Sequence, residues 1–350
     1  MPITHESELL NVGKGRIMIR FIVAMALGAL ALGPALAQSP AVIKFSHVVA
    51  PDTPKGKGAE KFKELGERYT DGRVKIEVYA NSSLYKDKEE VEALQLGAVQ
   101  MLAPSLAKFG PLGAREFEVF DLPYILPTKE ALRKITDGPI GKKLFAKLEP
   151  KGITGLAYWD NGFKIMSANR PLHMPADFRG LKMRIQSSKV LEAQIRALGA
   201  IPQVMAFSDV YQALQTGVVD GQDNVTSNIW TQKYYEVQKH LTVSYHGRLT
   251  YALVTNNKFW GSLPAEVRGG LDRAVKESTD YFNSVAETDN ADALEKIKAS
   301  GKIQVHVLTD TEKKAWVAKL MPVHKEMQSR FGKDFIDKIY KASGFIAPQS

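Results

Sequence analysis

The chain has 350 residues, of which 44% are hydrophobic and 24% charged, an ordinary globular balance that suggests two domains or one large one. It contains no cysteine, which excludes disulfides, thiolate zinc sites, cysteine nucleophiles and a lipid-modified N-terminal cysteine. The formal net charge is +9, but basic and acidic residues are interleaved, so the charge argues against nucleic-acid binding and favours encounter with small anions.

The N-terminal segment has the order of a secretory signal peptide. Basic residues precede an apolar run over 21–32, and the small-residue site Ala35-Leu36-Ala37 follows. The run is short for a membrane anchor, which needs about 20 residues. We therefore expect 1–37 to be a signal peptide cleaved after Ala37, which predicts a periplasmic protein. Met18 is an alternative start, because 18–37 is a complete signal by itself.

Beyond the signal, strand-like and helix-like segments alternate, which predicts an α/β protein. Up to Asn161, alternating apolar residues predict strands over 42–49, 74–79 and 153–159, and an apolar segment over 99–103. Helical spacing predicts helices over 58–69, 87–96 and 129–148.

After Asn161 the pattern restarts, with strands predicted over 163–167, 181–185 and 248–255 and helices over 188–198 and 209–216. Ser208 is the predicted N-cap of the second of these helices, and Asp220-Gly221 a turn leading to Asn224. A long helix is predicted to follow, with Ser262 as its cap and Pro264 in its first turn. Its apolar stripe comprises Val267, Leu271, Ala274, Ser278, Phe282 and Val285.

The common enzyme motifs are missing from the sequence. It has no dinucleotide-binding glycine motif, P-loop, G-x-S-x-G elbow or H-E-x-x-H, and no two of its seven histidines are spaced i, i+4. Each histidine is therefore interpreted as a surface or structural residue. The sequence predicts no enzyme, no metal site and no cofactor, although catalytic groups scattered along a chain would escape such a search.

Arg184 is the main candidate for a binding residue. Alternation in its predicted strand places Lys182 and Arg184 on one face, with Met183 and Ile185 on the other. Ligands in α/β proteins bind beyond the carboxyl ends of strands, where an arginine can hold a carboxylate through two parallel hydrogen bonds. An arginine on a solvated face fits the residue pattern equally well, so both interpretations stay open on residue chemistry alone.

Several long segments resemble the solute-binding proteins of tripartite ATP-independent periplasmic (TRAP) transporters, the DctP family, and within it the C4-dicarboxylate-binding branch. The segments are 45–48 (FSHV), 84–96 (LYKDKEEVEALQL), 160–167, 180–188 (GLKMRIQSS), 205–221 (MAFSDVYQALQTGVVDG) and 237–241. The resemblance extends over about the whole chain from Ala41 onward, and its matches are long stretches.

The resemblance implies roles for individual residues. The carboxylate-binding arginine of the family falls on Arg184, its partner asparagine on Asn224, and the aromatic that packs on the ligand on Phe207, which could also be plain core. A second basic position, arginine in sialic-acid-binding relatives, is Lys164 here. We expect Lys164 to hold the distal carboxylate of a dicarboxylate.

Weaker candidates lie in segments that approach the cleft in relatives, each as consistent with a structural role: His47, Lys86, Ser105 and Asn228. The neutral stretch Ala103-Pro104-Ser105 stands where the sialic-acid branch carries a glutamate, which argues against a sialic-acid or zwitterionic ligand.

The implied fold is the two-lobed periplasmic-binding-protein (type II-like) fold, with a cleft and a long helix bridging both lobes. Lobe I is predicted at 38–161 plus 250–289, and lobe II at 162–249 plus 290–350. The implied function is capture of C4-dicarboxylates (succinate, malate, fumarate) by a monomer that delivers them to TRAP membrane permease subunits. Three alternatives remain. The protein could bind another organic acid (a keto-acid or an aromatic acid), it could be the ligand-sensing partner of a membrane receptor kinase, or it could be a periplasmic enzyme that acts on an organic acid.

Overall fold

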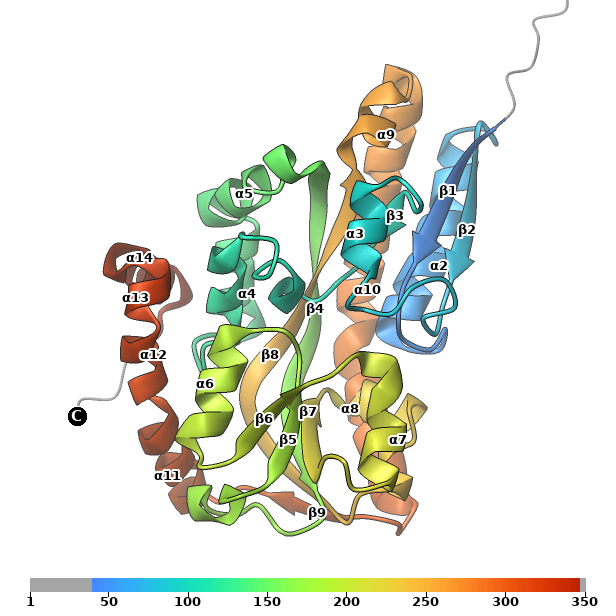
Figure 1. Ribbon diagram of the computed structural model, residues 1–350. Helices are drawn as coiled ribbons and strands as arrows, with labels where there is room; N and C mark the ends of the chain where they lie inside the picture. Colours follow the sequence, from blue (N-terminus) through green and yellow to red (C-terminus); the bar gives the residue numbers. More distant parts are fainter. Residues whose placement is uncertain (1–39, 347–350) are drawn as a thin grey trace, which may run out of the picture. The chain divides into compact units, whose positions relative to one another are not determined.

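In the computed structural model, which describes residues 40–346, the strands form one nine-stranded mixed sheet (Figure 1). Its order is β2-β1-β3-β8-β4-β7-β5-β6, and β9 pairs with β8. The strands are β1 Ala41–Ser46, β2 Val74–Tyr79, β3 Met101–Leu102, β4 Ile153–Ala168, β5 Lys182–Ile185, β6 Ile201–Val204, β7 Gly221–Asn224, β8 His240–Asn256 and β9 Gln304–Val307. The predicted α/β class is confirmed, whereas the predicted signal peptide lies outside the described residues.

Two long antiparallel strands, β4 and β8, run side by side through the sheet (Figure 1). They connect a parallel group on one side, where β1 pairs with β2 and β3, to another on the far side, where β5 pairs with β6 and β7. The sequence predicted separate strands over 153–159 and 163–167, but β4 is continuous. The register shifts between Asp160 and Phe163, and Gly162 has φ +92°, so a bulge absorbs the extra residues without ending the strand.

Helices surround the sheet. In chain order they are α2 Pro54–Tyr69, α3 Glu90–Gln95, α4 Lys129–Thr136, α5 Pro139–Ala146, α6 Lys189–Ala197, α7 Val210–Gln215, α8 Thr226–Thr231, α9 Asn257–Ser262, α10 Ala265–Ala299, α11 Asp310–Leu320, α12 Pro322–Glu326, α13 Gln328–Phe331 and α14 Lys333–Ser343. Side chains cap several of them: Thr53 accepts a hydrogen bond from the Gly56 amide at the start of α2, and Ser188 accepts one from Leu191 at the start of α6. No helix among the described residues is both long and apolar enough to cross a membrane.

Three local predictions were wrong. The single helix predicted over 129–148 is two helices, α4 and α5, because Pro139 has no amide proton for a continuing helix and starts a new one. Ser208 does not cap α7: its hydroxyl donates to Asp209 within a short 3₁₀ turn, Phe207–Asp209. Ser262 ends α9 by donating to the Phe259 carbonyl, and Pro264 occupies the cap position of α10.

The long helix α10 contacts elements of both predicted lobes. Its apolar stripe is buried as predicted, except that Val285 is half-buried, and Phe282 stacks on Trp159 of β4 with ring centroids 4.7 Å apart. Asp289 forms an ion pair with Lys57 of α2 at 2.7 Å. One residue later, the Asn290 main-chain carbonyl accepts a hydrogen bond from Thr226 of α8 at 2.6 Å. The lobe boundaries themselves stay a prediction.

Candidate functional site

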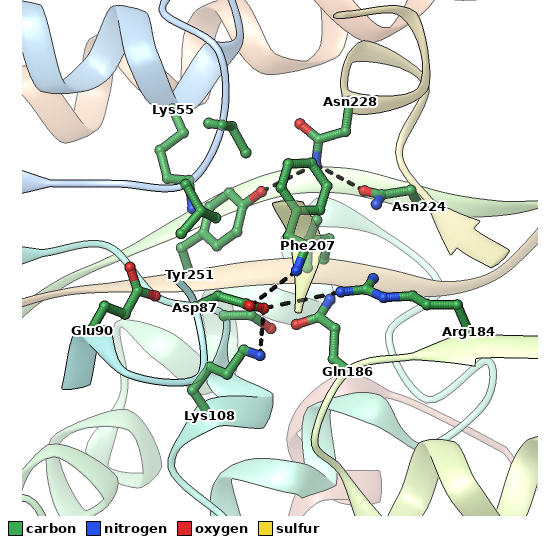
Figure 2. Close-up of a pocket in the computed structure, with 14 residues that line it drawn as sticks. Lys55, Asp87, Glu90, Lys108, Arg184, Gln186, Phe207, Asn224, Asn228 and Tyr251 are labelled. Atoms are coloured by element: carbon green, nitrogen blue, oxygen red, sulfur yellow. Dashed lines mark hydrogen bonds and ion pairs between the residues drawn. The ribbon is translucent and has the colours of Figure 1, made fainter. Parts of the chain in front are cut away.

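A small cavity of about 30 Å³ lies where β5 and β7 end. Five of the predicted binding residues line it: Arg184, Asn224, Phe207, Ser105 and Asn228. Six further polar residues that the sequence analysis did not single out complete its polar lining: Lys55, Asp87, Glu90, Lys108, Gln186 and Tyr251. Figure 2 shows these side chains converging from several elements.

Sheet register explains why Arg184 and Asn224 meet. Strands β5 and β7 are parallel, and Arg184 pairs with Gln222. Asn224 lies two residues further along β7, so its side chain is on the same face of the sheet as that of Gln222. Both strands end here, at the type of edge where ligands of α/β proteins bind. The opposite wall is built from the first turn of α2, the segment entering α3, the 3₁₀ turn Leu106–Lys108, and β8.

The guanidinium of Arg184 is buried, anchored and only partly used. It is 1% exposed, and its Nε and Nη2 donate to the Met205 carbonyl at 3.2 and 3.0 Å. Its Nη1 has no hydrogen-bond partner among residues 40–346. A buried unpaired donor is costly, so this nitrogen is suited to a ligand oxygen. Arg184 does not lie on a solvated face, so that interpretation of the strand pattern is wrong, and its contact with a carboxylate stays a prediction.

Asp87 lies between two cations (Figure 2). Its carboxylate is 2.5 Å from Lys108 Nζ and 4.0 Å from Arg184 Nη2, and it accepts a hydrogen bond from the Phe207 amide at 3.0 Å. Burial alone would raise the pKa of Asp87, but Lys108 and Arg184 hold it below its ordinary value. Asp87 is therefore an internal counter-ion that neutralises much of Lys108.

Lys55 has no such counter-ion. Its Nζ donates to the Ala103 carbonyl at 3.0 Å and lies 3.9 Å from the ring centroid of Tyr251. Burial lowers the pKa of Lys55 and raises the pKa of Glu90, which lines the same cavity, while the attraction between the two opposes both changes. No carboxylate within the described part of the chain lies within 4.0 Å of Lys55 Nζ.

Amides and a phenol form a connected polar wall. Asn228 donates from Nδ2 to Asn224 Oδ1 at 2.8 Å, and Asn161 donates to the Tyr251 hydroxyl at 3.1 Å. Asn224 Oδ1 also accepts from the Val225 amide at 3.0 Å. Because its oxygen is used twice, the amide nitrogen of Asn224 is the group that it can offer to a ligand.

The charges in the cavity favour an anion. Three basic side chains (Lys55, Lys108 and Arg184) face two carboxylates (Asp87 and Glu90), and burial raises the pKa of Glu90 while it lowers the pKa values of Lys55 and Lys108. Burying a carboxylate is prohibitive without cationic and hydrogen-bonding partners, and this cavity supplies both.

Lys164, the predicted second clamp, is not among these residues. It is 1% exposed, and its Nζ lies 2.7 Å from Asp223 Oδ2. Asp223 precedes Asn224 in β7, so its side chain is on the other face of the sheet. Burial would raise the pKa of Asp223, but Lys164, together with His246, holds it well below its usual range. The structure thus gives Lys164 an internal partner away from the cavity, and its contact with a ligand stays a prediction that this arrangement does not favour.

His47 and Lys86 also lie outside the cavity lining. His47 is buried beside Val48, and its pKa is lowered to about 3 by burial and by Lys55, so the ring is neutral. Lys86 is exposed and forms an ion pair with Asp209 at 2.8 Å.

Of the charged residues that sequence reasoning missed, two carried weak signals and two carried none. Asp87 and Glu90 lie in the resembling segment 84–96, and a spacing of three residues is the helical spacing for side chains on one side. Lys55 and Lys108 had no signal, because a single lysine in a polar stretch usually faces solvent. Only the tertiary fold shows that all four are buried.

A buried, cation-rich cavity at the edge of an α/β sheet is the kind of site that suits a small organic anion. The comparisons specify the family: residues 45–330 match the family model described as bacterial extracellular solute-binding protein, family 7 (DctP), and the chain belongs to this family of transport-associated binding proteins.

Relatives and solved structures agree with this assignment. The chain is 64% identical to the C4-dicarboxylate-binding periplasmic protein DctP of Rhodobacter capsulatus, over 93% of this chain and 99% of that protein. It is 44% identical to the C4-dicarboxylate-binding protein DctB of Bacillus subtilis, over 86% of each. A TRAP periplasmic solute-binding protein from Shewanella oneidensis, solved with succinate, matches with a TM-score of 0.84 and 43% identity, over 87% of this chain and 100% of that one. These likenesses confirm the predicted family and the periplasmic-binding-protein fold.

Proposed function

We propose that this protein captures C4-dicarboxylates such as succinate, malate and fumarate in the periplasm and delivers them to the membrane permease subunits of a TRAP transporter. The observation that carries the proposal is the buried, partly unpaired Arg184 in a cation-rich cavity of a chain that is 64% identical to a C4-dicarboxylate-binding protein. A structure from Pseudomonas aeruginosa with bound L-malate, 44% identical with a TM-score of 0.80 over 82% of this chain and 100% of that one, supports the same ligand class.

The two ends of the ligand are assigned to different walls. One carboxylate accepts hydrogen bonds from Arg184 Nη1 and the Asn224 amide. The other meets Lys55, the cation without an ion-pair partner in the described chain, with the Tyr251 hydroxyl and Ser105 nearby as donors. Lys55 belongs to predicted lobe I and Arg184 to predicted lobe II, so a dicarboxylate bridges the lobes and a monocarboxylate does not.

Entry of the ligand requires the walls to separate. A cavity of about 30 Å³ has room for about two water molecules, which is less than a four-carbon diacid occupies. Asp87 already joins the walls through the Phe207 amide and Arg184. The ligand therefore binds an opened form and strengthens the closed one, because only closure lets it contact both walls.

Calorimetry on protein that has been unfolded and refolded to remove retained ligand tests the assignment. We expect succinate, malate and fumarate each to bind one molecule per chain and to be recovered unchanged. Mass spectrometry of the ligand released from freshly purified protein gives an independent identification. Absence of heat with all three diacids, together with tight binding of a sugar or an amino acid, would reject the proposal.

A pair of lysine variants tests where the second carboxylate lies. Lys55→Met should weaken succinate far more than butyrate, by roughly tens- to thousands-fold, because succinate then has an unpaired second charge. Lys164→Met serves as the comparison, since Lys164 is equally buried but contacts Asp223. Lys164→Met should change the affinities for succinate and butyrate by the same factor. If Lys164→Met alone discriminates between the two acids, Lys164 is the distal clamp and the assignment of Lys55 is wrong.

A further inference from the structure

Three side chains outside the dicarboxylate cavity converge beside β9 and the first turn of α11. His173 precedes the 3₁₀ turn Pro175–Phe178, His306 lies in β9, and Glu312 lies in the first turn of α11. In the described range 40–346 they form the one group of three or more potential metal-ligating side chains whose ligand atoms all lie within 4.8 Å of one another. None of the three lines the cavity.

Their donor atoms lie close enough together for one ion to reach all three side chains. His306 Nε2 lies 2.8 Å from Glu312 Oε2, and His173 Nδ1 lies 3.7 Å from Glu312 Oε1. The two imidazoles stack with centroids 4.0 Å apart and planes 25° apart. Ligand atoms around a tetrahedral ion with bonds of about 2.0–2.1 Å lie about 3.3 Å apart, between the two measured separations.

Glu312 is held in place while keeping one oxygen available. Its Oε2 accepts hydrogen bonds from the main-chain amide and hydroxyl of Thr309, at 2.7 and 3.0 Å, in the capping box of α11. Oε1, the oxygen nearer to His173, takes no part in that box. The capping box therefore explains the position of the Glu312 carboxylate, but it does not explain why the imidazole of His173 lies close to Oε1.

The main chain of His173 is also fixed, although its side chain is exposed. Its amide donates to Asp177 Oδ2 at 2.9 Å, and its carbonyl accepts from Nε1 of the fully buried Trp316 at 2.9 Å. His306 is held by the β8–β9 pairing, opposite Thr242. A metal site needs ligands positioned in this way by surrounding contacts.

We propose that His173, His306 and Glu312 bind one Zn²⁺ ion, with water as the fourth ligand. Two imidazole nitrogens and one carboxylate oxygen are a donor set that suits zinc. The side chains of His173 and His306 are 46% and 32% exposed, so an ion can enter and water can complete its coordination. The ion would join β9 and α11 to the loop before Pro175, in a position independent of dicarboxylate capture.

The test uses untagged protein stripped with a chelator and titrated with Zn²⁺ at about pH 7.5, where imidazole nitrogens are free to coordinate. One ion per chain should bind, and saturation should raise the midpoint of thermal unfolding. His173→Ala, His306→Ala and Glu312→Gln should each weaken Zn²⁺ by roughly tenfold or more. Glutamine preserves the capping box, so Glu312→Gln removes the anionic ligand without removing the helix cap.

Asp310→Asn is the matched control, because it removes a carboxylate from the same first turn without touching the three ligands. It should keep the Zn²⁺ affinity of the unaltered protein, and all four variants should keep the affinity for succinate. The proposal is overturned if the unaltered protein takes up no Zn²⁺. It is equally overturned if Zn²⁺ binds the three ligand variants undiminished, or if Asp310→Asn and Glu312→Gln weaken it alike.

Discussion

Replacing Arg184 by lysine keeps the positive charge and removes the geometry that the ligand needs. Two of the guanidinium nitrogens donate to the Met205 carbonyl, which leaves the unpaired Nη1 as the donor that we propose binds the ligand. A lysine has one nitrogen, which cannot satisfy that carbonyl and reach a carboxylate in parallel. Hydrogen bonds to charged groups contribute about 1.5–3 kcal/mol each, so the loss of one or two predicts about 2–5 kcal/mol. Arg184→Lys should therefore weaken succinate by roughly 30-fold to several-thousand-fold.

Isothermal titration calorimetry with succinate measures this loss, and circular dichroism checks that the variant is folded. Arg170→Lys is the matched control: Arg170 is exposed and its Nη2 donates to the Arg179 carbonyl, so it resembles Arg184 in bonding but not in location. The control should bind as the unaltered protein does. If Arg184→Lys binds succinate within about threefold of the control, the Arg184 guanidinium does not contact the carboxylate and the reasoning fails.

Three further outcomes concern stability and are measured by urea denaturation. Burial raises the pKa of Asp121 from 3.8 to about 6, so the fold loses stability as the pH rises from about 4 to about 6. Asp121→Asn should raise the free energy of unfolding by roughly 2–3 kcal/mol at neutral pH and by little at about pH 4. Equal increases at both pH values would contradict the raised pKa of Asp121. Arg248→Met should cost about 3–5 kcal/mol, because it leaves the buried carboxylate of Asp160 without its bidentate partner, and a loss below about 1 kcal/mol would argue against that pair. In α10, Gly269→Ala should stabilise the fold by up to about 1 kcal/mol, because nothing lies within 4 Å of the added carbon. Gly270→Ala should destabilise the fold, because the added carbon would lie 2.5 Å from the carbonyl oxygen of Tyr69, the last residue of α2. A change of the same sign in both variants would refute the steric argument.

Local periodicity predicted most helices and strands as far as α10, because an amphipathic pattern is a property of consecutive residues. The elements that it did not predict are α8, α9, α11–α14, β6, β7 and β9. The stripe on α10 is an example: five of its six predicted positions are buried. The errors occurred where one residue has several possible local partners. Ser208 and Ser262 were both plausible caps, but each hydroxyl donates to a nearby oxygen instead, and the neighbouring helix begins elsewhere.

The sequence by itself determined the family, the α/β class and the position of Arg184 at a strand end, since long matching segments and alternation are readable along the chain. Which charges meet was decided only by the tertiary structure. Lys164 looked like a ligand residue, yet β7 places Asp223 beside it on the face away from the cavity. Lys55 carried no signal in the sequence, yet folding buries it with no carboxylate of the described residues within 4.0 Å of its Nζ. The physical reason is that the charge environment of a side chain depends on neighbours that packing brings together from distant parts of the sequence. Arg184 and Asp87, for example, are 97 residues apart.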